Sequence, residues 1–183
     1  MVKFLVMDVD GTLTDGKIYM SRDGEAFKAF DIKDGCGIKV ILPQYNIIPV
    51  IITGRKSAIL EQRCKELDIK EVHQDVHDKL KCLCEILNRY STDAQTYSLA
   101  DCAYIGDDLL DLPCIQAIKK AGGIAGCPRN AVNSIKQASN YVSPYNAGEG
   151  AVRDFIEYIT KTDSASFIER IKLVMHHAKH LKG

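Results

Sequence analysis

The fold of this protein is indicated first by residues 3–12, which read KFLVMDVDGT. A short run of apolar residues such as 4–7 is typical of a strand in a parallel sheet. Asp8 and Asp10 follow at once, and alternate positions of an extended chain point to the same side. The stretch therefore predicts a strand that ends in two carboxylates on the same side of the chain.

Outward from this stretch, short apolar runs alternate with amphipathic segments, which is the pattern of βαβ units. The expected strands are residues 3–7, 48–52, 71–73, 102–105, 123–125 and 141–142, and the expected helices are residues 37–42, 58–67, 79–90, 109–119, 131–138, 151–160 and 166–181. Pro43 is expected to end its helix at Leu42, since proline disfavours helical geometry in the residue before it. The pattern predicts a three-layer, Rossmann-like α/β fold around a parallel sheet.

A polar turn at residues 21–24 interrupts this alternation directly after the first strand. Because apolar residues flank the turn and it ends in Gly24, it predicts a β-hairpin over residues 17–30. An isolated two-stranded ribbon is only marginally stable in water. A partner surface is therefore expected to stabilise the hairpin.

The composition is that of a globular protein and limits the partners. Of 183 residues, 24 are Lys or Arg and 24 are Asp or Glu, so the formal net charge is zero. This balance argues against a nucleic-acid or membrane partner, since there is no basic excess to neutralise phosphates. The length predicts a single domain, with a core over residues 1–160 and a helical extension over residues 161–183.

Neither a signal peptide nor a membrane span is expected, because the apolar run at residues 4–7 ends at Asp8. The seven cysteines form no C-x-x-C pair. They are expected to be free thiols in a reducing compartment, which predicts a cytoplasmic protein.

Polar residues gather where the expected strands end, and ligands of open α/β sheets bind at this carboxyl edge. The residues expected there are Asp8, Asp10, Thr53, Arg55, Asp107, Asp108 and Asp111, with Lys79 at the start of a helix. Clustered carboxylates repel one another unless a cation neutralises them, and oxygen ligands suit Mg²⁺. A single strand-end Asp or Thr is equally consistent with a helix cap, so the predicted magnesium site depends on the whole set.

Four of these segments resemble the motifs of the haloacid dehalogenase superfamily of phosphotransferases: residues 8–14 (DVDGTLT), residues 52–54 (ITG), Lys79 and residues 106–111 (GDDLLD). Within that superfamily the chain is similar, from about residue 2 to residue 159, to the small capless phosphatases of phosphorylated ulosonic acids. Residues 29–35 (AFDIKDG) and 148–153 (GEGAVR) are part of this similarity. No cap domain is expected, because residues 15–34 have room only for the hairpin.

The resemblance implies a Mg²⁺-dependent phosphomonoesterase, with 3-deoxy-D-manno-octulosonate 8-phosphate as the expected substrate. Asp8 would be the nucleophile that forms an aspartyl-phosphate. Asp10 would protonate the leaving sugar oxygen and then deprotonate the hydrolytic water. Thr53 would donate a hydrogen bond to the phosphate, and Lys79 would balance the negative charge of nucleophile and phosphoryl group.

The resemblance also implies a set of metal ligands. Asp8, the backbone carbonyl of Asp10 and Asp107 would hold Mg²⁺, which would neutralise the phosphoryl oxygens. Asp108 and Asp111 would act one step further out, where they would orient the metal's water and Lys79.

Contacts to the rest of the substrate follow from the same resemblance. The candidates for its carboxylate are Arg55, Arg63 and Lys39, of which the arginines offer a planar fork that pairs with a carboxylate in two places. The further candidates are Asp31, Lys33, Asp34 and Gly35 around the sugar, besides Asp10 and Lys79. Similar phosphatases are tetramers in which hairpins pack centrally and a neighbouring subunit covers the site, so a homotetramer is expected.

Alternatives remain open at this point. Ala147 stands where similar phosphatases have glycine in a substrate-contacting loop, so a nine-carbon ulosonate 9-phosphate is an alternative substrate, although Arg55 favours the eight-carbon acid. An unrelated phosphate ester is another alternative. A non-catalytic assembly module of sugar-nucleotide biosynthesis is a third, although such modules lose a motif carboxylate and this chain keeps all of them. A receiver domain is disfavoured, because there the acidic pair precedes the phosphorylated Asp, whereas here Asp8 and Asp10 come first.

Overall fold

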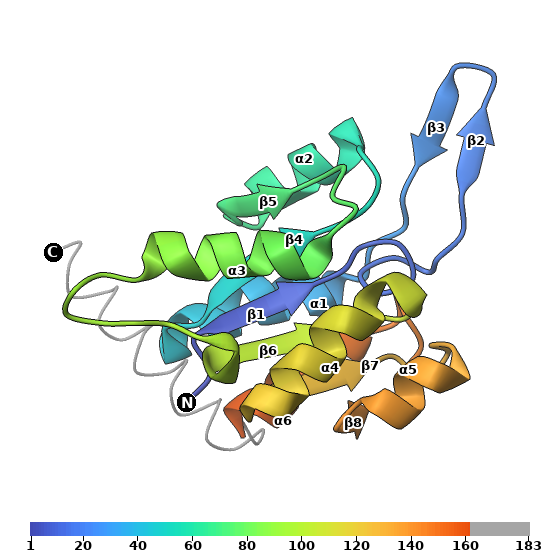
Figure 1. Ribbon diagram of the computed structural model, residues 1–183. Coiled ribbons are helices and arrows are strands. Elements are labelled where there is room, and N and C mark those ends of the chain that lie inside the picture. The colour runs from blue at the N-terminus through green and yellow to red at the C-terminus, as the bar shows by residue number, and fades with distance from the viewer. Residues whose placement is uncertain (162–183) are drawn as a thin grey trace, which may run out of the picture.

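Figure 1 shows the computed structural model, which describes residues 1–161, as a parallel sheet between helices. The sheet contains β1 (Phe4–Met7), β4 (Ile48–Ile52), β5 (Glu71–His73), β6 (Cys102–Ile105), β7 (Ile124–Cys127) and β8 (Tyr141–Val142). Their spatial order is β5-β4-β1-β6-β7-β8, and every neighbouring pair is parallel. The predicted Rossmann-like α/β fold is confirmed.

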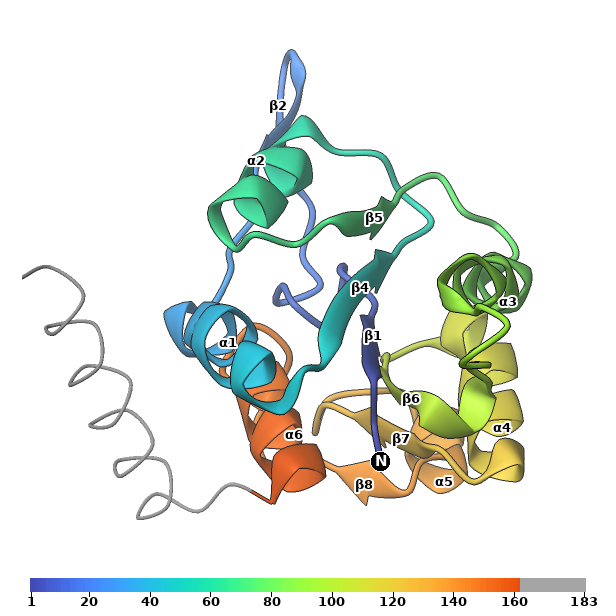
Figure 2. The same cartoon turned by 90° about the vertical axis from the view of Figure 1, so that its left-hand side faces the viewer.

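Helices cover both faces of this sheet. They are α1 (Ile32–Cys36), α2 (Ala58–Glu66), α3 (Lys79–Tyr90), α4 (Leu112–Ala121), α5 (Asn133–Ala138) and α6 (Ala151–Thr160). Figure 2 shows α1, α2 and α6 on one side and α3, α4 and α5 on the other. The fold therefore has the three layers that were predicted.

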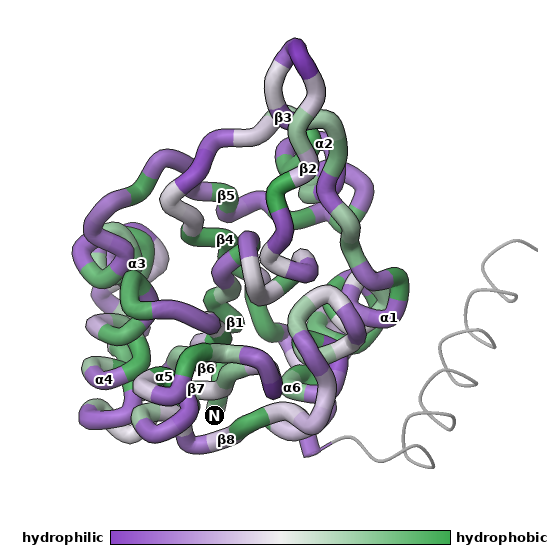
Figure 3. The backbone as a smooth tube through the Cα atoms, turned by 90° about the vertical axis from the view of Figure 1, so that its right-hand side faces the viewer, coloured by the Kyte–Doolittle hydropathy of each residue, from purple (hydrophilic) through white to green (hydrophobic). Residues whose placement is uncertain are grey.

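The hydrophobic core is divided by the sheet into two clusters, because alternate residues of a strand point to opposite faces. Leu5 and Met7 of β1 pack in the cluster that includes Phe155 of α6. Phe4 and Val6 pack in the cluster that includes Leu83 of α3. In Figure 3 the hydrophobic colour accordingly concentrates on the central strands β1, β4 and β6. A fully buried β1 gives the carboxylates that follow it a rigid support.

Several helix boundaries differ from the prediction. The helix expected over residues 109–119 begins at Leu112, after a 3-10 turn (Leu109–Asp111), and the one expected over residues 131–138 begins at Asn133. The largest difference is at the first helix. The helix expected over residues 37–42 begins five residues earlier as α1, where the Asp31 side chain accepts a hydrogen bond from the Lys33 amide. It then continues through a π-helical turn (Gly37–Ile41) and a 3-10 turn (Leu42–Tyr45) that contains Pro43. Proline is tolerated in the first turn of a new helix, where its missing N–H needs no partner. The run ends instead at Asn46, in the left-handed conformation.

The hairpin that was predicted after the first strand is present as β2 (Tyr19–Ser21) and β3 (Gly24–Phe27). It stands away from the sheet beyond the carboxyl ends of the strands (Figure 1) and exposes apolar side chains, among them Met20 at 64%. Within residues 1–161 no cap domain is inserted. No helix in this part of the chain is long and apolar enough to cross a membrane. The helix expected over residues 166–181 lies outside the described residues.

Candidate active site

The carboxyl ends of three neighbouring strands, β4, β1 and β6, meet at the middle of one sheet edge. Strand-like backbone pairing continues into the site, because the Asp8 amide donates to the Ile105 carbonyl at 3.1 Å and the Thr53 amide to the His73 carbonyl at 3.0 Å. A cleft of about 270 Å³ opens here. Among the residues that line it are Asp8, Asp10, Thr53, Arg55, Lys79, Asp107, Asp108 and Asp111. The structure thus brings together all eight side chains expected at this edge.

A buried ion triad forms the floor of the cleft. The Nζ of Lys79, at the first position of α3, lies 2.8 Å from Asp8 Oδ1 and 2.7 Å from Asp111 Oδ1. Burial alone lowers the pKa of Lys79, but the charges of the two carboxylates outweigh it and raise that pKa above its ordinary value. Lys79 is therefore a fixed positive charge beside one oxygen of Asp8.

Asp111 is held by more partners than any other carboxylate of the cleft. Its Oδ1 also accepts the hydroxyl of buried Tyr104 at 2.7 Å. Its Oδ2 accepts the backbone N–H groups of Asp107 at 2.9 Å and Asp108 at 3.2 Å. Because both oxygens are engaged, Asp111 is suited to fixing Lys79 and the loop after β6 rather than to binding a ligand. Asp108 caps the turn Leu109–Asp111, with its Oδ1 accepting the Leu109 amide.

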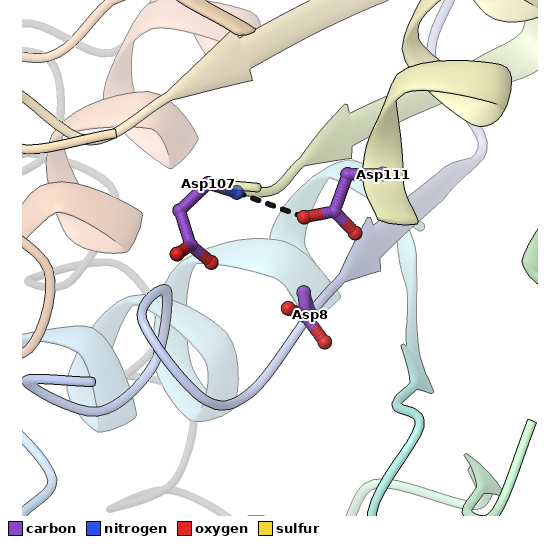
Figure 4. A group of neighbouring side chains, drawn as sticks. All are labelled: Asp8, Asp107 and Asp111. Atoms are coloured by element: carbon purple, nitrogen blue, oxygen red, sulfur yellow. Dashed lines mark hydrogen bonds between the residues drawn. The ribbon is translucent and has the colours of Figure 1, made fainter. Parts of the chain in front are cut away.

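Figure 4 shows that Asp8, Asp107 and Asp111 turn their carboxylates toward one another, with candidate ligand atoms within 4.8 Å. Burial, reinforced by the charge of Asp111, raises the pKa of Asp8 to about 6. Burial and the charges of Asp8 and Asp111 raise the pKa of Asp107 to about 7. Burial is the larger cause of both shifts, and the neighbouring negative charges add to it. A divalent cation with hard oxygen ligands fits such a group of carboxylates. Asp8 and Asp107 are the members with carboxylate oxygens available to such a cation.

The loop after β1 approaches Asp107 closely. Gly11 has φ of +90°, and a Cβ at this position would lie 2.1 Å from Asp107 Oδ2. Thr12 Oγ1 donates to Asp107 Oδ1 at 3.0 Å. Glycine is therefore required at residue 11 both by the backbone conformation and by the adjacent carboxylate.

Thr53 and Arg55, two of the groups predicted to contact the substrate, line the cleft after β4. Thr53 is buried, and its Oγ1 accepts the Arg55 amide at 3.5 Å. The Arg55 guanidinium reaches Glu25 of β3 at 3.3 Å. The hairpin thus provides the ionic partner of this arginine.

Asp10 and Lys79 also line the cleft, whereas the remaining six predicted substrate contacts lie outside it. Asp31, Asp34, Gly35 and Arg63 line a separate cavity of about 10 Å³, which has room for about one water molecule. The exposed Lys33 donates to the Glu149 carbonyl at 3.3 Å, and Lys39 donates to the Glu66 carbonyl at 2.6 Å. Within one chain, these six residues do not meet the carboxylate cluster.

Two functional candidates that were not predicted from the sequence are Lys28 of the hairpin segment and Tyr104 of the buried core. The Nζ of Lys28 contacts Asp10 Oδ1, and Tyr104 anchors Asp111. A lysine between apolar residues 27 and 30 of a half-exposed hairpin gives no local signal of burial. Tyr104 occupies an ordinary core position of a strand. Thr12, by contrast, lies within the motif of residues 8–14, and that position was a usable signal.

Comparisons with known proteins agree with this geometry. The chain is 35% identical over 158 residues to the 3-deoxy-D-manno-octulosonate 8-phosphate phosphatase of Salmonella typhi, covering 86% of this chain and 79% of the relative. The crystal structure of that phosphatase from Moraxella catarrhalis, with a magnesium ion, a phosphate ion and a KDO molecule, matches with a TM-score of 0.82. It is 36% identical, and the match covers 94% of this chain and 93% of that one. The chain belongs to the 3-deoxy-D-manno-octulosonate 8-phosphate phosphatase family.

This phosphatase family lies within the haloacid dehalogenase superfamily, as the motifs implied. A Legionella pneumophila structure described as a HAD superfamily (subfamily III A) hydrolase matches with a TM-score of 0.77 at 31% identity, over 87% of this chain and 82% of that one. No protein-family model matches the chain. The family is therefore shown by sequence identity to individual relatives and by the fold that they share with this chain.

Asp34 generates a prediction about stability and pH. Burial raises its pKa from 3.8 to about 7, and its Oδ2 is buried without a hydrogen-bond partner among residues 1–161. Between these two pH values the unfolded chain loses a proton that the folded chain keeps, so raising the pH favours unfolding. The free energy of unfolding of the natural protein, relative to Asp34→Asn, is expected to fall by about 1 kcal/mol or more from pH 4 to pH 7 and then level off.

Urea titrations of both proteins between pH 4 and pH 8 measure this difference. In the natural protein, the backbone N–H of Arg153 donates to Asp34 Oδ1 at 2.7 Å. The side-chain oxygen of the asparagine in the Asp34→Asn variant can accept the same hydrogen bond, so the variant removes only the titrating group. A difference that does not change with pH would contradict the raised pKa.

Proposed function

We propose that this chain is a Mg²⁺-dependent phosphatase that hydrolyses 3-deoxy-D-manno-octulosonate 8-phosphate through an aspartyl-phosphate on Asp8. The observation that carries the proposal is the buried Asp8–Lys79–Asp111 triad at the carboxyl edge of the sheet. It occurs in a chain that is 35% identical to enzymes with this activity over 86% of its length.

The first step uses the oxygen of Asp8 that Lys79 does not hold. Asp8 Oδ2 attacks phosphorus, a P–O bond to Asp8 forms, and the P–O bond to the sugar breaks. Asp10 gives its proton to the departing sugar oxygen. Lys79 stays beside Asp8 Oδ1 and balances the negative charge that collects in the transition state.

The second step returns the enzyme to its starting state. Asp10, now a carboxylate, accepts a proton from a water molecule, whose oxygen attacks phosphorus. The bond between phosphorus and Asp8 breaks, and inorganic phosphate leaves. Thr53 donates a hydrogen bond to the phosphoryl oxygens in both steps.

The metal would be held by Asp8, the backbone carbonyl of Asp10 and Asp107. When bound, Mg²⁺ supplies positive charge that offsets the repulsion between the anionic phosphate and the anionic nucleophile. Asp108 and Asp111 would not bind the metal themselves but would hold the loop that carries Asp107. Asp111 Oδ2 accepts the Asp107 amide, while its Oδ1 accepts the Tyr104 hydroxyl.

Recognition of the sugar acid is proposed to involve Arg55 within the chain and further residues across a subunit boundary. Arg55 lines the cleft, and its fork suits the substrate carboxylate. The candidates outside the cleft, which are Asp31, Lys33, Asp34, Gly35, Lys39 and Arg63, would contribute only where chains adjoin. A homotetramer with the apolar hairpins at its centre would bring chains together in this way and would cover the open site.

We also propose residues 1–160 as the phosphatase core of a single domain and the cytoplasm as its location. All seven cysteines are free, which agrees with a reducing compartment.

The deciding experiment measures phosphate release with Mg²⁺ from octulosonate 8-phosphate, nine-carbon ulosonate 9-phosphates and simple sugar phosphates. The expected result is a preference of about 100-fold in kcat/KM for the octulosonate, which corresponds to about 2.7 kcal/mol. Asp8→Asn is expected to release no phosphate while it stays folded, because an amide is a poor nucleophile. A preference for a nine-carbon substrate would replace the octulosonate as the proposed substrate. Similar kcat/KM for all the phosphate esters would contradict the ulosonate proposal but keep the phosphatase. No phosphate release from any of them would favour an assembly role.

Lys79→Ala tests the balancing charge. Loss of one preorganised cation is expected to raise the barrier by about 2 kcal/mol or more, or at least about 30-fold in kcat/KM. Lys81→Ala, an exposed position on the same helix α3, is the matched control and is expected to keep its activity. Thermal unfolding of both variants checks that the fold is retained, and a kcat/KM near normal in Lys79→Ala would reject the role of this residue.

Sedimentation tests the assembly. The natural protein is expected at four times its chain mass of 20.3 kDa. Met20→Asp, which places a charge on the exposed apolar face of the hairpin, is expected to reduce that mass, whereas Met20→Leu is expected to preserve it. A monomeric natural protein, or a tetramer that is indifferent to Met20→Asp, would refute the proposed central hairpins.

A further inference from the structure

The hairpin places a buried cation on the proposed acid and base of the reaction. Lys28 lies directly after β3, and its side chain is only 3% exposed. Its Nζ contacts Asp10 Oδ1 and lies 3.0 Å from Glu25 Oε1. A lysine withdrawn from water in this way requires paired carboxylates, so its placement is tightly determined.

Glu25 fixes this lysine to the body of the protein. Its Oε1 also accepts the Arg55 guanidinium at 3.3 Å, and its Oε2 accepts the hydroxyl of Ser57 at 2.5 Å. Ser57 in turn caps the start of α2, where its side chain accepts the Leu60 amide at 3.4 Å. A continuous chain of polar contacts thus runs from the first turn of α2 through the hairpin to Asp10.

We infer that Lys28 is a positioning residue for Asp10, holding Oδ1 so that Oδ2 is directed to the transferred proton. This inference rests on the proposed function, in which Asp10 serves the leaving group and the water. Among residues 1–161, Lys28 is the hydrogen-bond partner of the Asp10 carboxylate. A carboxylate in an open cleft rotates about two side-chain bonds, and proton transfer requires one orientation of it.

A positioning role of this kind has a distinctive kinetic signature. Asp10 takes no part in the attack of Asp8 on phosphorus, so a leaving group that departs as a stable anion needs no proton from it. p-Nitrophenolate is such a leaving group, whereas a sugar or other alkyl alkoxide is not. Both substrates need the second step, because the same aspartyl-phosphate must be hydrolysed.

The test compares Lys28→Met with the natural protein on octulosonate 8-phosphate, a simple alkyl phosphate and p-nitrophenyl phosphate. For the sugar and alkyl esters, kcat/KM is expected to fall by about 30-fold or more, within the range of general acid catalysis. For p-nitrophenyl phosphate, kcat/KM is expected to change by less than about 3-fold, because it reports only steps up to the departure of p-nitrophenolate. Mixing Lys28→Met with p-nitrophenyl phosphate is expected to give a burst of about one p-nitrophenolate per active site. Slow turnover is expected to follow, because the aspartyl-phosphate is then hydrolysed slowly.

Three variants make the result interpretable. Lys17→Met removes a lysine of the same hairpin segment whose side chain is 73% exposed, and it is expected to leave kcat/KM unchanged for all three substrates. Lys28→Arg keeps the charge and is expected to restore most of the activity on alkyl esters. Asp10→Asn is the reference, and it is expected to show the same contrast between substrates as Lys28→Met, to a larger extent.

The outcomes separate this inference from the proposed function. If Asp10→Asn shows the contrast and Lys28→Met does not, the role of Lys28 is overturned and that of Asp10 stands. If Asp10→Asn shows no contrast, the proposed acid itself fails. An equal loss on all esters in Lys28→Met would assign Lys28 to general support of the site and overturn the inference. If thermal unfolding shows that Lys28→Met does not fold, Lys28→Gln, which keeps a neutral donor, is put to the same comparison.

Discussion

The site depends on a buried ammonium group between two carboxylates. Lys79 lies within 2.8 Å of Asp8 and 2.7 Å of Asp111, and all three side chains are almost entirely withdrawn from water. A single carboxylate left unpaired in such a place destabilises a protein by several kcal/mol. The parallel sheet makes the triad possible, since its strands all deliver their ends to one edge while α3 begins there.

Asp111 connects this triad to the backbone. Its two oxygens hold Lys79, Tyr104 and the loop after β6, which also carries Asp107. The position of the metal candidates and the position of the balancing cation are therefore set by one side chain. This arrangement lets Asp8 keep one oxygen against Lys79 and the other available to phosphorus.

The hairpin forms part of the site as well as an exposed apolar surface. Glu25 and Lys28 reach from β3 and its end to Arg55 and Asp10, and Ser57 secures Glu25 to α2. A capless phosphatase lacks a lid, and here a two-stranded ribbon supplies the ionic partners of both a proposed substrate contact and the proposed acid. An interaction that fixes the position of the hairpin therefore also fixes the orientation of the Asp10 carboxylate, through Lys28.

The amino-acid sequence by itself determined the strands, most helices and the gathering of carboxylates at one edge. These features follow from patterns within single segments. Apolar runs such as residues 4–7 form buried strands, and because the strands of a parallel sheet all run in the same direction, their carboxyl ends lie at one edge. The start of α1, the turn through Pro43 and the pairing of Lys28 with Asp10 were decided only by tertiary structure. Charge pairing and burial depend on distances between segments far apart along the chain, and the spacing of residues in one segment does not encode those distances.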